Sequence, residues 1–190
     1  GESGWVAMLA AAKERRITAL GLVAAPSTRG VEFVLEQQRQ MLVRMEISDE
    51  ERLSKMELQR RIHEAVLTGD DWDDIPPDMR KQADTPWFSS YLNFWPADVI
   101  QDLRQPMVVI HGGLDRQIVP GHADRLLEMG LARDRRVATE LVRFDALNHL
   151  LVPAVTGEVN EYPTLETRSV SAELIAALGE KLHKVMPSRR

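Results

Sequence analysis

Three short apolar runs alternate with longer segments of helical character, and this alternation constrains the fold more than any other feature. The runs cover residues 17–25, 107–110 and 139–144. The first run is too short and too uniformly apolar for a surface helix, whereas strands covered on both faces have this composition. Strands that alternate with helices form parallel sheets, because each helix crosses back over the sheet. The sequence therefore predicts an α/β fold with a parallel sheet of about three strands and flanking helices.

Length and composition are those of an ordinary globular chain. The 190 residues are 28% charged, 44% hydrophobic and 5% aromatic. A chain of this length removes roughly two thirds of its unfolded surface from water, so it can bury a sizeable core. The net charge is -5, the pI is near 5.6, and no basic cluster is interleaved with aromatic residues. These properties argue against nucleic-acid binding.

The residue types also limit the chemistry that we expect. Cysteine is absent, so the chain has neither disulfides nor thiolate metal sites. Histidines and carboxylates lack the spacing of a metal site, and no apolar run approaches the roughly 18–20 residues of a membrane span. The first residues do not have the features of a signal peptide. We therefore expect no metal, no other cofactor, no membrane span and, by default, a cytoplasmic location.

The segment 31–95 differs in character from the rest, because it is charged, helix-periodic and without strand signals. Its run Ser48-Asp49-Glu50-Glu51 is a capping box, so one helix is predicted to end near Met45 and the next to begin at Asp49. That second helix should stop at Gly69, and a shorter one should follow Pro77. We interpret residues 1–30 and 96–190 as one α/β core and residues 31–95 as a helical insertion.

Aromatic residues gather at the end of this insertion. Five of the ten in the chain lie between Trp87 and Trp95. In one interpretation these rings pack the insertion onto the core, because aromatic side chains bury the most area per residue. In the other, some of them line a pocket for an acyl or aryl group.

A polar residue suited to acid–base chemistry follows each of the last two apolar runs. Asp115 follows residues 107–110, and His149 follows residues 139–144. Both are predicted in loops at the carboxyl ends of strands, where open α/β sheets place their chemistry. Asn148 is expected to shape the loop that carries the histidine. The pair is predicted to act as acid and base.

The chain begins with Gly1-Glu2-Ser3-Gly4-Trp5, which gives the order serine, aspartate, histidine along the sequence. With the helical insertion after the first strand, this order resembles the carboxyl-terminal half of a serine α/β hydrolase, and the resemblance covers nearly the whole chain. It implies cleavage of a carboxylic ester or related acyl bond through an acyl-enzyme. Ser3 would be the nucleophile, His149 the base, Asp115 its orienting acid, and residues 31–95 a lid. A peptidase or a thioester hydrolase would use the same triad.

The amino-terminal motif fits the family in three registers. Gly-x-Ser-x-Gly with Ser3 as nucleophile requires glycine where the chain has Trp5. In a second register Gly1 takes the nucleophile position, which would leave a non-catalytic α/β-hydrolase-like interaction module. In a third, a gap between Ser3 and Gly4 restores the motif.

The family's first strands and part of its oxyanion hole have no counterpart in these residues. The run 17–25 would then be an exposed apolar edge strand, which the amino-terminal half of a longer hydrolase or a second copy must cover. We expect such a fragment to be weakly active or inactive alone and its substrate to be a small ester or acyl compound. Nucleotide binding is disfavoured, because no glycine-rich loop follows a strand.

The four remaining histidines are expected to have no catalytic role. His111 closes the run 107–110 beside two glycines and is predicted to be structural. The others lie on predicted helices and are expected to be solvated: His63, His122 and His183.

Overall fold

The structure, a computed structural model, describes residues 1–134 and 136–186. It divides into two compact units, which are considered separately below. The sheet unit comprises residues 1–27 and 96–190, and the helical unit comprises residues 28–95. Residue 135 and residues 187–190 of the predicted core lie outside the described residues. A lid function of the helical unit stays a prediction.

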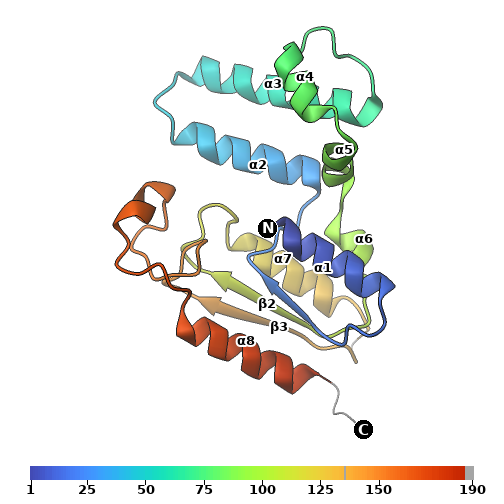
Figure 1. Cartoon of the computed structure of the whole chain (residues 1–190), viewed down its shortest axis with the longest axis vertical. Coiled ribbons are helices and arrows are strands. Elements are labelled where there is room, and N and C mark those ends of the chain that lie inside the picture. Colours follow the sequence, from blue (N-terminus) through green and yellow to red (C-terminus); the bar gives the residue numbers. More distant parts are fainter. Residues whose placement is uncertain (135, 187–190) are drawn as a thin grey trace. The chain divides into compact units, whose positions relative to one another are not determined.

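The sheet unit is built on three parallel strands in the order β1-β2-β3 (Figure 1). Leu20 lies opposite Met107 on β2, and Met107 lies opposite Thr139 on β3. The predicted α/β class with a three-stranded parallel sheet and flanking helices is confirmed. The strands are β1 (Leu20–Val23), β2 (Met107–Gly112) and β3 (Thr139–Phe144).

The first strand is shorter than predicted. The apolar run extends over residues 17–25, but only four of its residues pair with β2. Ala24 ends the strand with a φ of 45°, a left-handed conformation that no strand accommodates. Among the described residues no strand pairs with the outer side of β1, so it is an edge strand as predicted.

Helices cover both faces of the sheet. Helices α1 and α7 lie on one face and α8 on the other (Figure 1), so all six residues of β2 are buried. Val108 and Ile110 pack with Leu174 of α8. The N-cap of α8 is Ser171, whose Oγ accepts from the Leu174 amide at 3.4 Å. The helices of this unit are α1 (Glu2–Lys13), α6 (Pro96–Ile100), α7 (Gly121–Leu131), the 3-10 helix η1 (Val159–Thr164) and α8 (Ala172–Val185).

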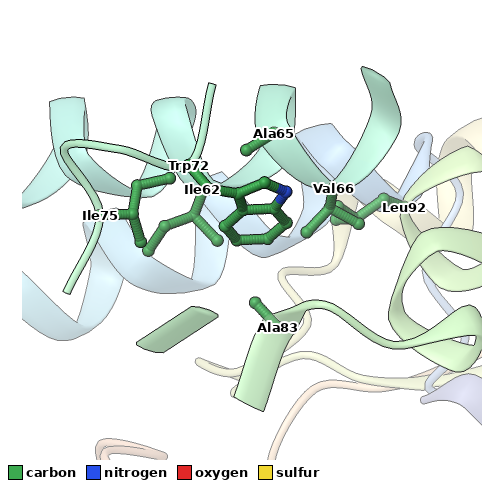
Figure 2. Close-up of a cluster of buried hydrophobic side chains, with 7 residues drawn as sticks. All are labelled: Ile62, Ala65, Val66, Trp72, Ile75, Ala83 and Leu92. Atoms are coloured by element: carbon green, nitrogen blue, oxygen red, sulfur yellow. The ribbon is translucent and has the colours of Figure 1, made fainter. Parts of the chain in front are cut away.

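The helical unit has its own core. Trp72 and six other buried side chains form this core, with the Trp72 ring at its centre (Figure 2). The predicted break between its two long helices is confirmed, as is the stop at Gly69, which has a φ of 84°. None of the described helices is long and apolar enough to cross a membrane. The helices of this unit are α2 (Gly30–Val43), α3 (Asp49–Thr68), α4 (Pro77–Ala83) and α5 (Pro86–Asn93).

The aromatic segment forms α5 and the residues just after it. Trp87 is exposed, and its ring stacks on Phe88 at 6.0 Å and lies 5.4 Å from the ring of Tyr91. The guanidinium of Arg29 lies 4.5 Å from the Trp95 ring centre. Leu92, not an aromatic ring, is the residue of α5 that is fully buried in the core.

His63 corrects one sequence-based expectation. It is buried rather than solvated, because it lies on the face of α3 that carries Ile62 and Val66. Its Nε2 lies 2.9 Å from Nε2 of Gln59, and its ring meets the Phe88 ring edge-on. Burial lowers the pKa of His63 to about 4, so the ring is neutral at pH 7. His183 is exposed, as expected.

The cap of α3 gives a stability prediction. The Ser48 hydroxyl accepts from the Glu51 amide at 3.1 Å, so Ser48→Ala is expected to lower the free energy of unfolding by about 1 kcal/mol. Ser54→Ala is the matched control, because Ser54 is exposed within the same helix, and it should change stability by less than about 0.5 kcal/mol. Urea unfolding followed by circular dichroism measures both. Equal effects would show that the cap contributes nothing.

Candidate active site

Asp115 lies in the turn that follows β2. Its side chain is fully buried, and Oδ1 accepts from the amides of Gln117 and Ile118 at 2.9 and 2.8 Å. Aspartate favours such turns because its short side chain can bond amides two or three residues ahead. The two amides fix one carboxylate oxygen and leave Oδ2 for another partner.

His149 supplies that partner from the loop after β3. Its Nδ1 lies 2.9 Å from Oδ2 of Asp115. A carboxylate can only accept, so Nδ1 carries the proton and Nε2 of the neutral ring has a free lone pair. The side chain is 26% exposed, whereas that of Asp115 is fully buried. The structure therefore brings the predicted acid and base together, with the basic nitrogen on the accessible residue.

Asn148 organises the histidine loop. It is fully buried, and its Oδ1 accepts from the amides of Leu150 at 2.9 Å and Val152 at 3.4 Å. Leu151 has a φ of 62°, which turns the chain back toward the sheet. The backbone N–H of Asn148 also donates to the Val152 carbonyl at 3.1 Å. These bonds hold His149 at the tip of a tight turn.

A close approach of backbones joins the two loops. The Leu114 amide donates to the Leu147 carbonyl at 2.9 Å, one residue before the acid and two before the base. A Cβ at Gly112 would lie 2.3 Å from the Leu147 oxygen, so only glycine fits there. The glycine that ends β2 thus lets the loops of Asp115 and His149 meet.

His111 lies directly behind the acid. It is fully buried, its Nε2 is 2.7 Å from the Ile118 carbonyl, and the same nitrogen is 3.6 Å from Oδ2 of Asp115. The carbonyl only accepts, so Nε2 carries the proton. Burial is the main cause that lowers the pKa of His111. A neutral His111 closes the Asp115 turn and leaves the carboxylate charge to His149, which agrees with its predicted structural role.

Among the described residues, Ser3 forms no hydrogen bond with the acid and base. It is exposed in the first turn of α1, and Gly1, not Ser3, is the N-cap residue of that helix. An elbow nucleophile lies at the junction of strand and helix. The hydrogen bond between acid and base is therefore present, but among the described residues no hydrogen bond connects Ser3 to this pair.

A second polar cluster was missed by sequence analysis. His122 was expected to be solvated, yet it is fully buried, and its Nδ1 accepts from the Ser27 amide at 3.0 Å. Arg125 donates to Ser27 Oγ at 2.8 Å and to His122 Nδ1 at 3.1 Å. Helical spacing was the available signal, because His122 lies four and eight residues before buried Leu126 and Gly130.

Among the described residues no group of three or more histidines and carboxylates could hold a metal ion. A pocket of about 660 Å³ lies beside the histidine loop, but neither Asp115 nor His149 lines it. Its lining residues include Phe144, Pro153 and Ser171. We therefore do not assign the chemistry of the pair to this pocket.

Comparisons with known proteins find matches among solved structures. No family model and no curated protein matches the chain. One matching solved structure is a meta-cleavage product hydrolase from Pseudomonas fluorescens IP01, a serine-to-alanine mutant complexed with acetates. The match has 18% sequence identity and a TM-score of 0.41, and it covers 94% of this chain. The chain spans only 61% of the length of that structure.

Proposed function

We propose that this chain is the carboxyl-terminal part of a serine α/β hydrolase and contributes its acid and base. The observation that carries the proposal is the 2.9 Å bond from His149 Nδ1 to buried Asp115 Oδ2. It lies at the carboxyl edge of a parallel sheet, where α/β enzymes place their chemistry. The proposed substrate is a small carboxylic ester or related acyl compound.

The pair is suited to activate a hydroxyl nucleophile. His149 Nε2 would take the hydroxyl proton as the oxygen attacks the acyl carbon, and then deliver that proton to the leaving group. The imidazolium formed between these steps lies against the Asp115 carboxylate, which stabilises it. His111 is neutral and does not compete for that carboxylate.

The proposed hydrolase also needs a nucleophile, oxyanion donors and a strand that covers the edge of β1. Ser3 is the nucleophile in one register, and a residue upstream of Gly1 supplies it if the elbow is displaced. We propose that a further parallel strand, from an amino-terminal half or a second copy, pairs with the outer edge of β1. The described residues alone are expected to be weakly active or inactive.

One observation favours a second function. Gly1 caps α1 while Ser3 lies within the helix, which is the register without a nucleophile. In that case the chain is a non-catalytic interaction module that keeps the hydrolase fold. The two functions differ in whether a nucleophile stands at the junction of strand and helix.

Active-site labelling tests the proposal. The complete natural protein is treated with a fluorophosphonate, and the modified residue is identified by mass spectrometry. We expect one serine to be labelled in the wild type and labelling to be lost in His149→Ala. His183→Ala, an exposed histidine on α8, is the control and should label normally. No labelling of a folded wild-type protein would reject the hydrolase and favour the interaction module.

A further inference from the structure

Arg125 carries a charge that no acidic side chain of the described residues balances. Its side chain is half-buried on α7. Among the described residues no ion pair joins its guanidinium to a carboxylate, whereas nearby Arg143 pairs with Asp124 at 2.6 Å. A cation that is partly removed from water without a counter-charge is unfavourable, and an anionic ligand relieves that cost.

Two buried side chains fix the guanidinium in one orientation. Nε donates to Ser27 Oγ at 2.8 Å, and Nη2 donates to His122 Nδ1 at 3.1 Å. Ser27 is 1% exposed and His122 is fully buried, so the anchors cannot move aside easily. Both bonds use the side of the planar group that carries Nε. The opposite end of the guanidinium carries the Nη1 hydrogens and the second Nη2 hydrogen. It can therefore offer two parallel N–H donors to a bidentate acceptor.

Space lies beside these donors. A Cβ built on Gly121 would meet only Nη1 of Arg125 within 4 Å, at 3.6 Å. Glycine at this position therefore leaves Nη1 uncovered on that side. A larger residue would place its side chain against the guanidinium.

The cluster belongs to the same sheet edge as the proposed acid and base. Ser27 follows β1, Asp115 follows β2, and α7 begins at Gly121, shortly after Asp115. His111 Nε2 is 3.6 Å from Asp115 Oδ2, and His122 is among the groups that lower the pKa of His111.

We propose that the free end of the Arg125 guanidinium, anchored by Ser27 and His122, binds the oxyanion group of a ligand. The ligand class is a carboxylate or a phosphate, since both present paired oxygens to the fork of an arginine. This site does not depend on hydrolysis. If the hydrolase proposal also holds, the site selects substrates with an acidic group.

Titrations with formate and with phosphate test the site. The complete natural protein is followed by amide NMR at constant ionic strength, because salt screens exposed charges. In the wild type we expect saturable amide shifts at Ser27 and Gly121. In Arg125→Gln the affinity for the anion should be at least about tenfold weaker than in the wild type, since charge-assisted bonds are lost. If formate binds more tightly than phosphate, the natural ligand group is a carboxylate. If phosphate binds more tightly, the group is a phosphate. Arg104→Gln, an exposed arginine whose guanidinium forms no ion pair among the described residues, should bind like the wild type.

Two further variants separate binding from stability. Arg125→Lys keeps the charge but loses the fork, and Ser27→Ala keeps the fork but removes one anchor. Both should remain folded in thermal melts and bind severalfold more weakly. The proposal is overturned if neither anion saturates the wild type, or if the folded variants bind as well as the wild type.

Discussion

Asp115→Asn is expected to slow nucleophile activation in the complete natural protein by about 10⁴-fold while leaving the fold intact. Oδ1 of the new amide can still accept from Gln117 and Ile118, which preserves the turn. At the Oδ2 position an NH2 group replaces the acceptor of the His149 Nδ1 proton. The imidazole then loses both its correct tautomer and the charge that stabilises its protonated form.

Rates of fluorophosphonate labelling and of p-nitrophenyl ester hydrolysis measure this loss. Asp145→Asn is the matched control, because Asp145 is an exposed aspartate on the loop of His149. Its labelling and hydrolysis rates should stay within about threefold of the wild-type rates, as expected for a surface change outside the site. If Asp115→Asn also stayed within tenfold of the wild-type rates, Asp115 would not be the acid.

The strands and most helices followed from the sequence because their apolar pattern decides their structure. The prediction for β3 matches the observed strand residue for residue. The first strand was predicted too long, because the positive φ of Ala24 depends on the chain leaving the sheet and not on its apolar side chain. Element type was therefore easier to predict than element ends.

Of the site residues, only those that follow the end of a strand could be predicted from the sequence. Asp115 and His149 each follow a strand, so their meeting at one edge required only the parallel order. His122 was wrongly expected to be solvated, because its partner Ser27 lies 95 residues earlier in the chain. The role of Ser3 could not be derived, since the first residues can be aligned with the motif in three registers and each register departs from it. Long-range partners and an ambiguous motif thus limited the functional prediction.

Gly112→Ala is expected to have a large effect through geometry alone. Its Cβ would lie 2.3 Å from the Leu147 oxygen and 2.9 Å from the Asn148 oxygen, both of them backbone atoms. Backbone cannot rotate away as a flexible side chain can, so the histidine loop must shift. We expect a loss of roughly 1–3 kcal/mol or more in the free energy of unfolding, the range for overpacking a close contact.

Gly179→Ala is the matched control for this prediction. Gly179 lies inside α8, and a Cβ there would meet nothing within 4 Å, so alanine should stabilise the helix by roughly 0.5–1 kcal/mol. Urea unfolding should therefore give changes of opposite sign for the same substitution at two glycines. The Gly112 clash is with the loop that holds His149. The fluorophosphonate labelling rate of Gly112→Ala should therefore fall even under conditions where the variant is folded. Equal stability and normal labelling in Gly112→Ala would show that the two loops do not need this close approach.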